Sequence, residues 1–175
     1  MYVRRVIVGV SGSAGSLQAL RYAAEMARSD TAMLAPVLAW TPPGGELADR
    51  RAPCPELRLA WTEAALERLS RAIELAIGGP PAELAFCPQI YRGPAGQVLS
   101  ELATEPGDVL VIGAGRRGAI RLATSKVSRY CLGHARCPVI AVPPSQLALE
   151  AHGLHGWRLR HRMQARDADL HAADA

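Results

Sequence analysis

Short apolar runs rich in β-branched residues alternate along the chain with segments of helical periodicity. The first run, residues 4–10 (RRVIVGV), leads through a turn rich in serine and glycine into a helical segment. The apolar stripe of that segment is formed by Leu17, Leu20, Ala24 and Ala27. Strands that are apolar throughout and alternate with helices are typical of a parallel sheet covered on both faces. The chain is therefore predicted to be an α/β protein with an open, doubly wound parallel sheet.

The same alternation continues to residue 143. Further strands are predicted over residues 32–40, 83–91, 107–114 and 137–143. Helices are predicted over residues 57–77 and 127–135, with a turn and a short helix over 93–105. Residues 41–56 hold four prolines and two glycines, which indicates a loop.

Two features refine these elements. The long helix over residues 57–77 is expected to bury one stripe, made of Leu59, Leu66, Leu69, Ile73 and Ile77. Pro88 lacks the backbone N–H that a central strand would use, so the strand over residues 83–91 is expected at an edge of the sheet.

Composition limits the chain to one full domain and excludes several classes of protein. Its 175 residues, 49% of them apolar, can build one buried core. We expect this domain to span residues 1–144 and residues 145–175 to form a C-terminal extension, a short helix followed by a frayed tail. The net charge of +4 is modest and the basic residues are dispersed, so composition alone does not argue for a nucleic-acid or membrane partner. A basic nucleic-acid accessory protein is a weaker hypothesis, which is disfavoured because residues 151–175 hold four arginines and three aspartates and so have a net charge of only +1. The sequence shows no leader or spanning segment and four irregularly spaced cysteines, so a cytoplasmic protein with reduced thiols is expected.

In a sheet of this kind, ligands bind beyond the carboxyl ends of the strands where the winding direction reverses. The loops after Val10 and after Ile112 are therefore the candidate binding loops. The second loop runs into glycines and arginines, and it is followed by a predicted helix. Glycines allow backbone N–H groups to approach phosphate oxygens, and a helix N-terminus adds partial positive charge.

Four segments in this order resemble the universal stress protein family: RRVIVGVSGSAGSLQAL, GPAGQVLSELA, DVLVIGAGRRG and VSRYCLGHARCPVIAVP. The resemblance covers residues 4–143. It implies a five-stranded parallel sheet in the order 3-2-1-4-5, of the adenine nucleotide alpha hydrolase-like type, often dimerised through the last strand. Many members of the family bind ATP without a Walker-type phosphate loop, whereas others bind nothing detectable.

The resemblance also shows where this chain departs from the nucleotide-binding members. An aspartate ends the first strand of those members, and Ser11 stands in its place here. Their phosphate loop has a glycine, two residues, a glycine, nine residues, and a glycine followed by serine or threonine. Gly113 matches the first glycine, Arg116 stands in place of the second, and Gly115 comes one residue early. Counted back from the last strand, Ser125 and Lys126 take the places of the final glycine and its hydroxyl partner, and the loop is one residue short.

A β-carbon at either altered glycine position would obstruct the approach of phosphate. Four cations surround the loop instead: Arg116, Arg117, Arg121 and Lys126. Guanidinium groups bind phosphate with two parallel hydrogen bonds, so the same loop has the composition of an anion site. A solvated basic loop, with Gly113, Gly115 and Gly118 as ordinary turn residues, is the other interpretation.

Two hypotheses about function follow. The first is a homodimeric, non-enzymatic stress-response module that acts by binding or regulation, in which ATP binding is weak or lost and no cofactor is required. The alternative is a nucleotide-dependent switch that binds ATP or another adenine nucleotide. The residues that would hold the nucleotide are Ser11, Gly12, Ala39, Gly113, Gly115, Arg116, Arg117, Gly118, Ser125 and Lys126. The absence of an aspartate at Ser11 and the shortened loop favour the first.

Other chemistry has less support. Cys131, His134 and Cys137 are three residues apart and offer only three metal ligands, so no metal site is predicted. The three serines of SGSAGS lack the G-x-S-x-G elbow of a hydrolase, and no histidine lies in the first half of the chain to act as a base. No catalytic residues are therefore predicted.

Overall fold

The protein is described by a computed structural model for residues 2–115 and 126–143, which all belong to the unit Met1–Pro144. Within these residues, five parallel strands form one sheet in the order β3-β2-β1-β4-β5. They are β1 (Arg5–Gly9), β2 (Met33–Trp40), β3 (Gln89–Arg92), β4 (Asp108–Gly113) and β5 (Val139–Val142). The predicted fold class and strand order are confirmed. The expectation for residues 145–175 lies outside the described residues.

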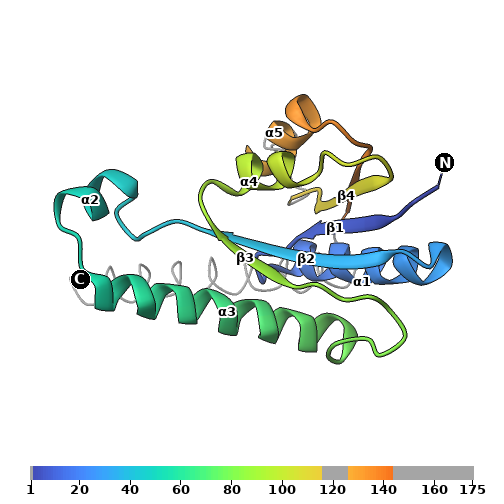
Figure 1. Cartoon of the computed structure of the whole chain (residues 1–175), viewed down its shortest axis with the longest axis horizontal. Helices are drawn as coiled ribbons and strands as arrows, with labels where there is room; N and C mark the ends of the chain where they lie inside the picture. Colours follow the sequence, from blue (N-terminus) through green and yellow to red (C-terminus); the bar gives the residue numbers. More distant parts are fainter. Residues whose placement is uncertain (1, 116–125, 144–175) are drawn as a thin grey trace, which may run out of the picture. The chain divides into compact units, whose positions relative to one another are not determined.

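Helices cover both faces of the sheet (Figure 1). They are α1 (Ala14–Asp30), α2 (Glu46–Arg51), α3 (Pro55–Ile77), α4 (Ala95–Leu102) and α5 (Lys126–His134). Helices α1 and α3 pack together on one face, and α4 packs with α5 on the other. Helix α2 lies apart from both pairs, beyond the end of the sheet (Figure 1).

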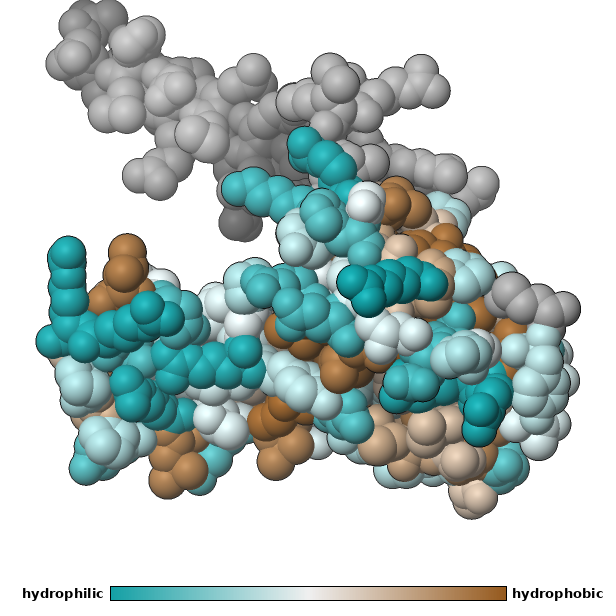
Figure 2. Space-filling view, turned by 45° about the horizontal axis from the view of Figure 1, so that its top comes forward, coloured by the Kyte–Doolittle hydropathy of each residue, from teal (hydrophilic) through white to brown (hydrophobic). Residues whose placement is uncertain are grey.

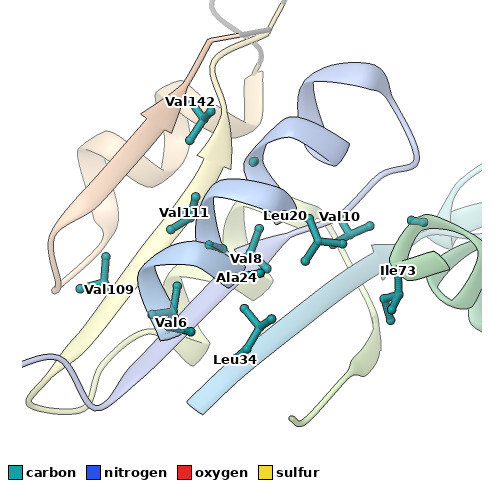
Figure 3. Close-up of a cluster of buried hydrophobic side chains, with 14 of the residues drawn as sticks. Val6, Val8, Val10, Leu20, Ala24, Leu34, Ile73, Val109, Val111 and Val142 are labelled. Carbon is teal, nitrogen blue, oxygen red and sulfur yellow. The ribbon is translucent and has the colours of Figure 1, made fainter. Parts of the chain in front are cut away.

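Alternation of side chains along the strands divides the core between the two faces. Val6 and Val8 of β1 point toward α1, where they pack in one cluster with Leu20 (Figure 3). Ile7, between them in sequence, belongs to the second cluster with Leu99 of α4. All five side chains are at most 2% exposed. The sheet is therefore buried on both faces, which explains why its strands are apolar throughout.

The start of α1 is fixed by its own serines. Ser13 is the N-cap residue, and its hydroxyl accepts a hydrogen bond from the backbone N–H of Ser16. Such a cap contributes about 1 kcal/mol to helix stability. The helix then presents a face of small residues to the sheet, including Ala23, Ala24 and Ala27, each fully buried. Small side chains let the α1 backbone lie close to β1 and β4.

Two predicted elements need correction. The strand predicted over residues 83–91 contributes one isolated bridge, between Phe86 and Leu34, and regular pairing begins only at Gln89. Pro88 accounts for this late start because it has no N–H to donate. The predicted edge position of the strand is confirmed. The loop predicted over residues 41–56 contains helix α2, so the prediction of a loop from proline content was wrong for this part of the segment.

The predicted stripe of the long helix is also partly wrong. Leu69 and Ile73 are buried, but Leu59 is 61% exposed and Leu66 is 54% exposed. The buried residues of α3 begin only at Ala65. The first ten residues of the helix therefore contribute no buried side chain, and exposed apolar residues form separate patches among hydrophilic ones (Figure 2).

An ion pair joins β1 and β4 at the amino end of the sheet. The Arg5 guanidinium donates to both carboxylate oxygens of Asp108, at 2.9 and 2.7 Å, and to the carbonyl of Leu102 at 3.0 Å. Burial alone would raise the pKa of the Asp108 carboxyl, but hydrogen bonds from Arg5 and from the backbone N–H of Glu105 lower it below its ordinary value. The carboxylate is therefore ionised and fully bonded where the two strands begin.

Candidate functional site

Three of the predicted site residues lie on, or directly after, neighbouring strands at the carboxyl edge of the sheet. Gly9 pairs with Val37 on one side, and Val8 pairs with Val111 on the other. This register places Ser11, two residues beyond Gly9, level with Ala39 of β2. Gly113 ends β4, which lies beside β1. Because β1 lies where the winding direction reverses, the structure brings these residues to the edge where α/β proteins bind ligands.

The loop after β1 is closed by hydrogen bonds among its own serines. The backbone N–H of Ser11 donates to the hydroxyl of Ser16 at 3.2 Å. The Ser11 and Ser13 hydroxyls share a hydrogen bond of 3.0 Å, and the Ser16 hydroxyl donates to the Ser13 carbonyl at 2.9 Å. These bonds satisfy the N–H of Ser11 and the hydroxyls of Ser11, Ser13 and Ser16 within the loop itself. Ser11 itself supplies no negative charge to this edge of the sheet.

Gly113 is needed for packing. A β-carbon built on it would lie 2.9 Å from the carbonyl carbon and from the carbonyl oxygen of Gly15, in the first turn of α1. Backbone atoms cannot move aside as a flexible side chain can, so a larger residue here would push α1 away from β4. The match of Gly113 to a phosphate-loop glycine therefore has a structural explanation that requires no ligand.

The other two described glycines of the site allow turns. Gly12 has φ +81° and Gly115 has φ +80°, a region of backbone conformation that L side chains rarely adopt. The Gly113 carbonyl accepts a hydrogen bond of 3.0 Å from the hydroxyl of Ser128 in α5. This bond ties the end of β4 to the helix that follows the loop.

Part of the predicted cationic loop lies outside the described residues. This is true of Arg116, Arg117, Gly118, Arg121 and Ser125. Lys126 is described, and it is the exposed first residue of α5. Of the cations predicted around the loop, the structure therefore places Lys126 alone.

Arg68 was missed in the sequence analysis. It lies on α3, and a β-carbon built on Gly12 would be 3.9 Å from its Cγ atom, so the alkyl stem of Arg68 lies beside the loop after β1. Arg68 is exposed and forms no ion pair or hydrogen bond with another described residue. No motif marks it. The sequence could have indicated Arg68 only through its position on the helix, next to the buried stripe that includes Ala65 and Leu69.

Helix α2 is held at the carboxyl end of β3 by ion pairs. Arg58 Nε donates to Asp49 Oδ1 at 2.9 Å, and Arg92 Nη2 donates to Glu46 Oε2 at 2.6 Å and to Asp49 Oδ2 at 2.5 Å. Arg58 first, and then Arg92, hold the pKa of the Asp49 carboxyl below its ordinary value. The Arg92 guanidinium also lies 5.8 Å from the ring centroid of Trp40, where β2 ends. The carboxylates of α2 are thus already bound by arginines.

The cysteines form no disulfide, and all four are free. Burial raises the pKa of the Cys131 thiol, which makes it less reactive. Among residues 2–115 and 126–143, no three histidine, cysteine or acidic side chains gather as a metal site would require. No helix in the same ranges is long and apolar enough to cross a membrane.

Comparison with known proteins identifies the family. The sequence pattern of the universal stress protein family matches residues 2–143. The chain belongs to the universal stress protein family. This confirms the resemblance noted from the four sequence segments. A comparison with curated proteins gives no significant match.

Solved structures of universal stress proteins share the fold. A universal stress protein in complex with cAMP is 26% identical, with 83% of this chain and 100% of that chain covered and a TM-score of 0.52. A universal stress protein from Lactobacillus plantarum is 20% identical, with 81% and 99% covered and a TM-score of 0.55. A universal stress protein from Archaeoglobus fulgidus in complex with dAMP is 19% identical, with 81% and 99% covered and a TM-score of 0.53.

Proposed function

We propose that this universal stress protein is a non-enzymatic binding or regulatory module whose affinity for ATP is weak. The observation that carries the proposal is the loop after β1, where Ser11 replaces the aspartate and its backbone N–H and hydroxyl bond to Ser16 and Ser13. No carboxylate is available there to hold a ribose. The packing of Gly113 against α1 supports the proposal, because it explains the glycine without a phosphate.

In this proposal, the remaining affinity for ATP and other anions comes from positively charged side chains. Arg116, Arg117 and Lys126 follow β4 in sequence, and Arg68 lies beside Gly12 across the same edge. Positive charge next to the N-terminus of α1 attracts polyanions. A site of this kind recognises phosphate charge rather than the adenine base.

The alternative is an adenine-nucleotide switch, and one observation favours it. The universal stress protein that is 26% identical to this chain was solved in complex with cAMP. In this alternative the base lies beside Ala39 at the end of β2, and the phosphate lies near Gly12, Gly115 and Lys126. Ala39 is partly buried and pairs with Tyr91 of β3, so its backbone is fixed in the sheet.

A first experiment distinguishes the two. Mass spectrometry of small molecules released from the denatured, purified protein should find no stoichiometric adenine nucleotide. The variant Ser11→Asp should bind ATP more tightly than the wild type, because it restores the carboxylate of the nucleotide-binding members. A nucleotide carried through purification, or a Ser11→Asp variant that binds no better, would contradict the proposal.

We further propose that the protein is a homodimer that pairs through β5. This strand lies at the edge of the sheet, so its outer backbone groups have no strand partner among the described residues. An apolar edge strand with unpaired backbone groups is a template for pairing with a second copy.

A further inference from the structure

A groove separates α4 from α5 on the face of the sheet opposite α1 and α3. Its volume is about 320 Å³. It is lined by the later parts of both helices, close to where β4 and β5 begin. The groove therefore lies at the amino edge of the sheet, whereas the candidate nucleotide site lies at the carboxyl edge.

Two stacked rings form one side of the groove. The rings of Tyr130 and His134, one helical turn apart on α5, lie 4.1 Å apart between centroids at an angle of 8°. His134 Nδ1 lies 2.9 Å from the Tyr130 carbonyl oxygen. A carbonyl only accepts, so Nδ1 carries the proton and Nε2 of the neutral ring is left as an acceptor. On the α4 side, a β-carbon on Gly96 would lie 2.8 Å from Tyr130 Cβ, so Tyr130 packs directly against the backbone of α4.

Charged groups of both signs also line the groove. Arg136 follows α5, and it forms no ion pair or hydrogen bond with another residue in the described part of the chain. Glu101 of α4 accepts a hydrogen bond of 2.9 Å from Gln97 Nε2, which fixes its carboxylate. Both residues are exposed, but no ion pair joins them. The groove therefore presents a separate cation and a separate anion to a ligand.

Ser100 provides an independent observation. It lines the same groove and is only 7% exposed, yet its hydroxyl has no hydrogen-bond partner within the described residues. In the same part of the chain, its one polar contact is with the Cys131 thiol: burial raises the pKa of that thiol, and Ser100 lowers it in part. A thiol is only a weak hydrogen-bonding group. Buried hydroxyls usually have a stronger partner than a thiol, so Ser100 keeps capacity for a hydrogen bond at the groove.

We propose that this groove binds a small aromatic carboxylate. The ring stacks on His134, the carboxylate pairs with Arg136, and a donor on the far side of the ring bonds to Glu101. The volume is at the lower end of the range for ligand pockets, which suits a ligand with a single ring. This site is independent of the proposed nucleotide function, because it uses other residues at the opposite edge of the sheet.

The test is an NMR titration of the full-length, ¹⁵N-labelled protein with three probes: 4-aminobenzoate, benzoate and cyclohexanecarboxylate. Saturable shifts are expected in residues 97–104 and 130–136. Benzoate should bind about three- to tenfold more tightly than cyclohexanecarboxylate, the gain expected from one aromatic pair. The added amine of 4-aminobenzoate should tighten binding further through Glu101. The substitution Arg136→Gln should weaken benzoate binding by about two- to fivefold, the range for an exposed charge pair.

The matched control is Arg129→Gln, which removes an exposed arginine of α5 that does not line the groove. It should leave benzoate affinity unchanged. The proposal is overturned if no probe saturates by about 10 mM, if the shifts lie elsewhere, or if Arg129→Gln weakens binding as much as Arg136→Gln. The last result would show attraction to net positive charge only.

Discussion

At the scale of single residues, the structure separates glycines that serve packing from glycines that serve turns. Gly113 and Gly15 are neighbours across the contact between β4 and α1, but a β-carbon has very different consequences at the two positions. At Gly113 it meets backbone at 2.9 Å, whereas at Gly15 nothing lies within 4 Å. The pair therefore provides a matched test of the packing explanation.

We predict that Gly113→Ala destabilises the protein by about 1–3 kcal/mol, the range for overpacking a close contact. Gly15→Ala should instead be neutral or stabilising by up to about 1 kcal/mol, because alanine favours a helix over glycine. Urea denaturation of both variants measures the difference. Equal stability of the two variants would show that the contact between Gly113 and α1 can accommodate a β-carbon.

The Arg5–Asp108 pair gives a prediction about pH. The pKa of Asp108 is lower in the folded state than in the unfolded state. Its contribution to the free energy of unfolding is therefore complete above the ordinary carboxyl pKa of about 4 and is lost as the pH falls toward the folded-state pKa. Asp108→Asn should lower the free energy of unfolding by about 3 kcal/mol at neutral pH, the lower end of the range for breaking a buried ion pair. The lower end applies because the Arg5 side chain is 27% exposed and keeps some contact with water.

Denaturation of wild type and Asp108→Asn between neutral pH and pH 3 measures this contribution. The difference in unfolding free energy between the two proteins should shrink below about pH 4. A difference that stays constant as the solution is acidified would contradict the lowered pKa.

At the scale of elements, α2 depends on ion pairs with other elements of the fold. It has six residues and no side chain that caps its N-terminus, and the ion pairs of Glu46 and Asp49 with Arg58 and Arg92 attach it to α3 and β3. A helix this short is marginal by itself. Its order should therefore follow the integrity of these ion pairs.

We predict that Asp49→Asn raises amide hydrogen exchange in α2 while exchange in β1 and β4 stays unchanged. Asp49 is bonded to both arginines, so its neutralisation weakens both attachments at once. The control is Glu83→Gln, which removes one partner of the exposed Arg28–Glu83 pair. Exposed pairs contribute little, so α2 exchange should not change there. Unaltered exchange of α2 in Asp49→Asn would refute this account.

Elements of the fold that depend on a local sequence pattern were predicted, whereas those that depend on contacts between separate elements were not. The strands around Val6, Leu34 and Val109 were predicted because burial on both faces leaves a local apolar pattern. Helix α2 was missed because it is stabilised by ion pairs with side chains outside it, Arg58 of α3 and Arg92 of β3, in a segment whose prolines indicate a loop. The exposure of Leu59 could not be predicted either, because helical periodicity does not show how far the helix extends past the sheet.

The candidate site was predicted less completely. The meeting of Ser11, Ala39 and Gly113 at one edge follows from the strand order, which the resemblance to the universal stress protein family implied. The role of Gly113 was not predictable, because it depends on how closely the α1 backbone approaches β4. Arg68 was missed because its proximity to Gly12 arises from the packing of α3 beside α1.

At the scale of the whole molecule, the proposed dimer makes its own prediction. Sedimentation analysis at micromolar concentration should show a dimer, and Ile140→Glu should shift it toward monomer by placing a charge on β5. The control is Leu75→Glu on α3, where the wild-type leucine is 58% exposed and far from β5 along the sheet. Circular dichroism checks that both variants fold. A wild-type protein that is only monomeric would remove the proposal.

The central claim is that the carboxyl edge of the sheet attracts anions by charge and does not select adenine. Calorimetric titration with ATP, GTP and tripolyphosphate tests it most directly, at salt concentrations of about 0.01 M and about 1 M, where the screening length falls from about 30 Å to about 3 Å. We predict weak binding of similar strength for all three ligands, lost at high salt. Tight binding of ATP alone, unchanged at high salt, would contradict the account and show a preformed adenine site.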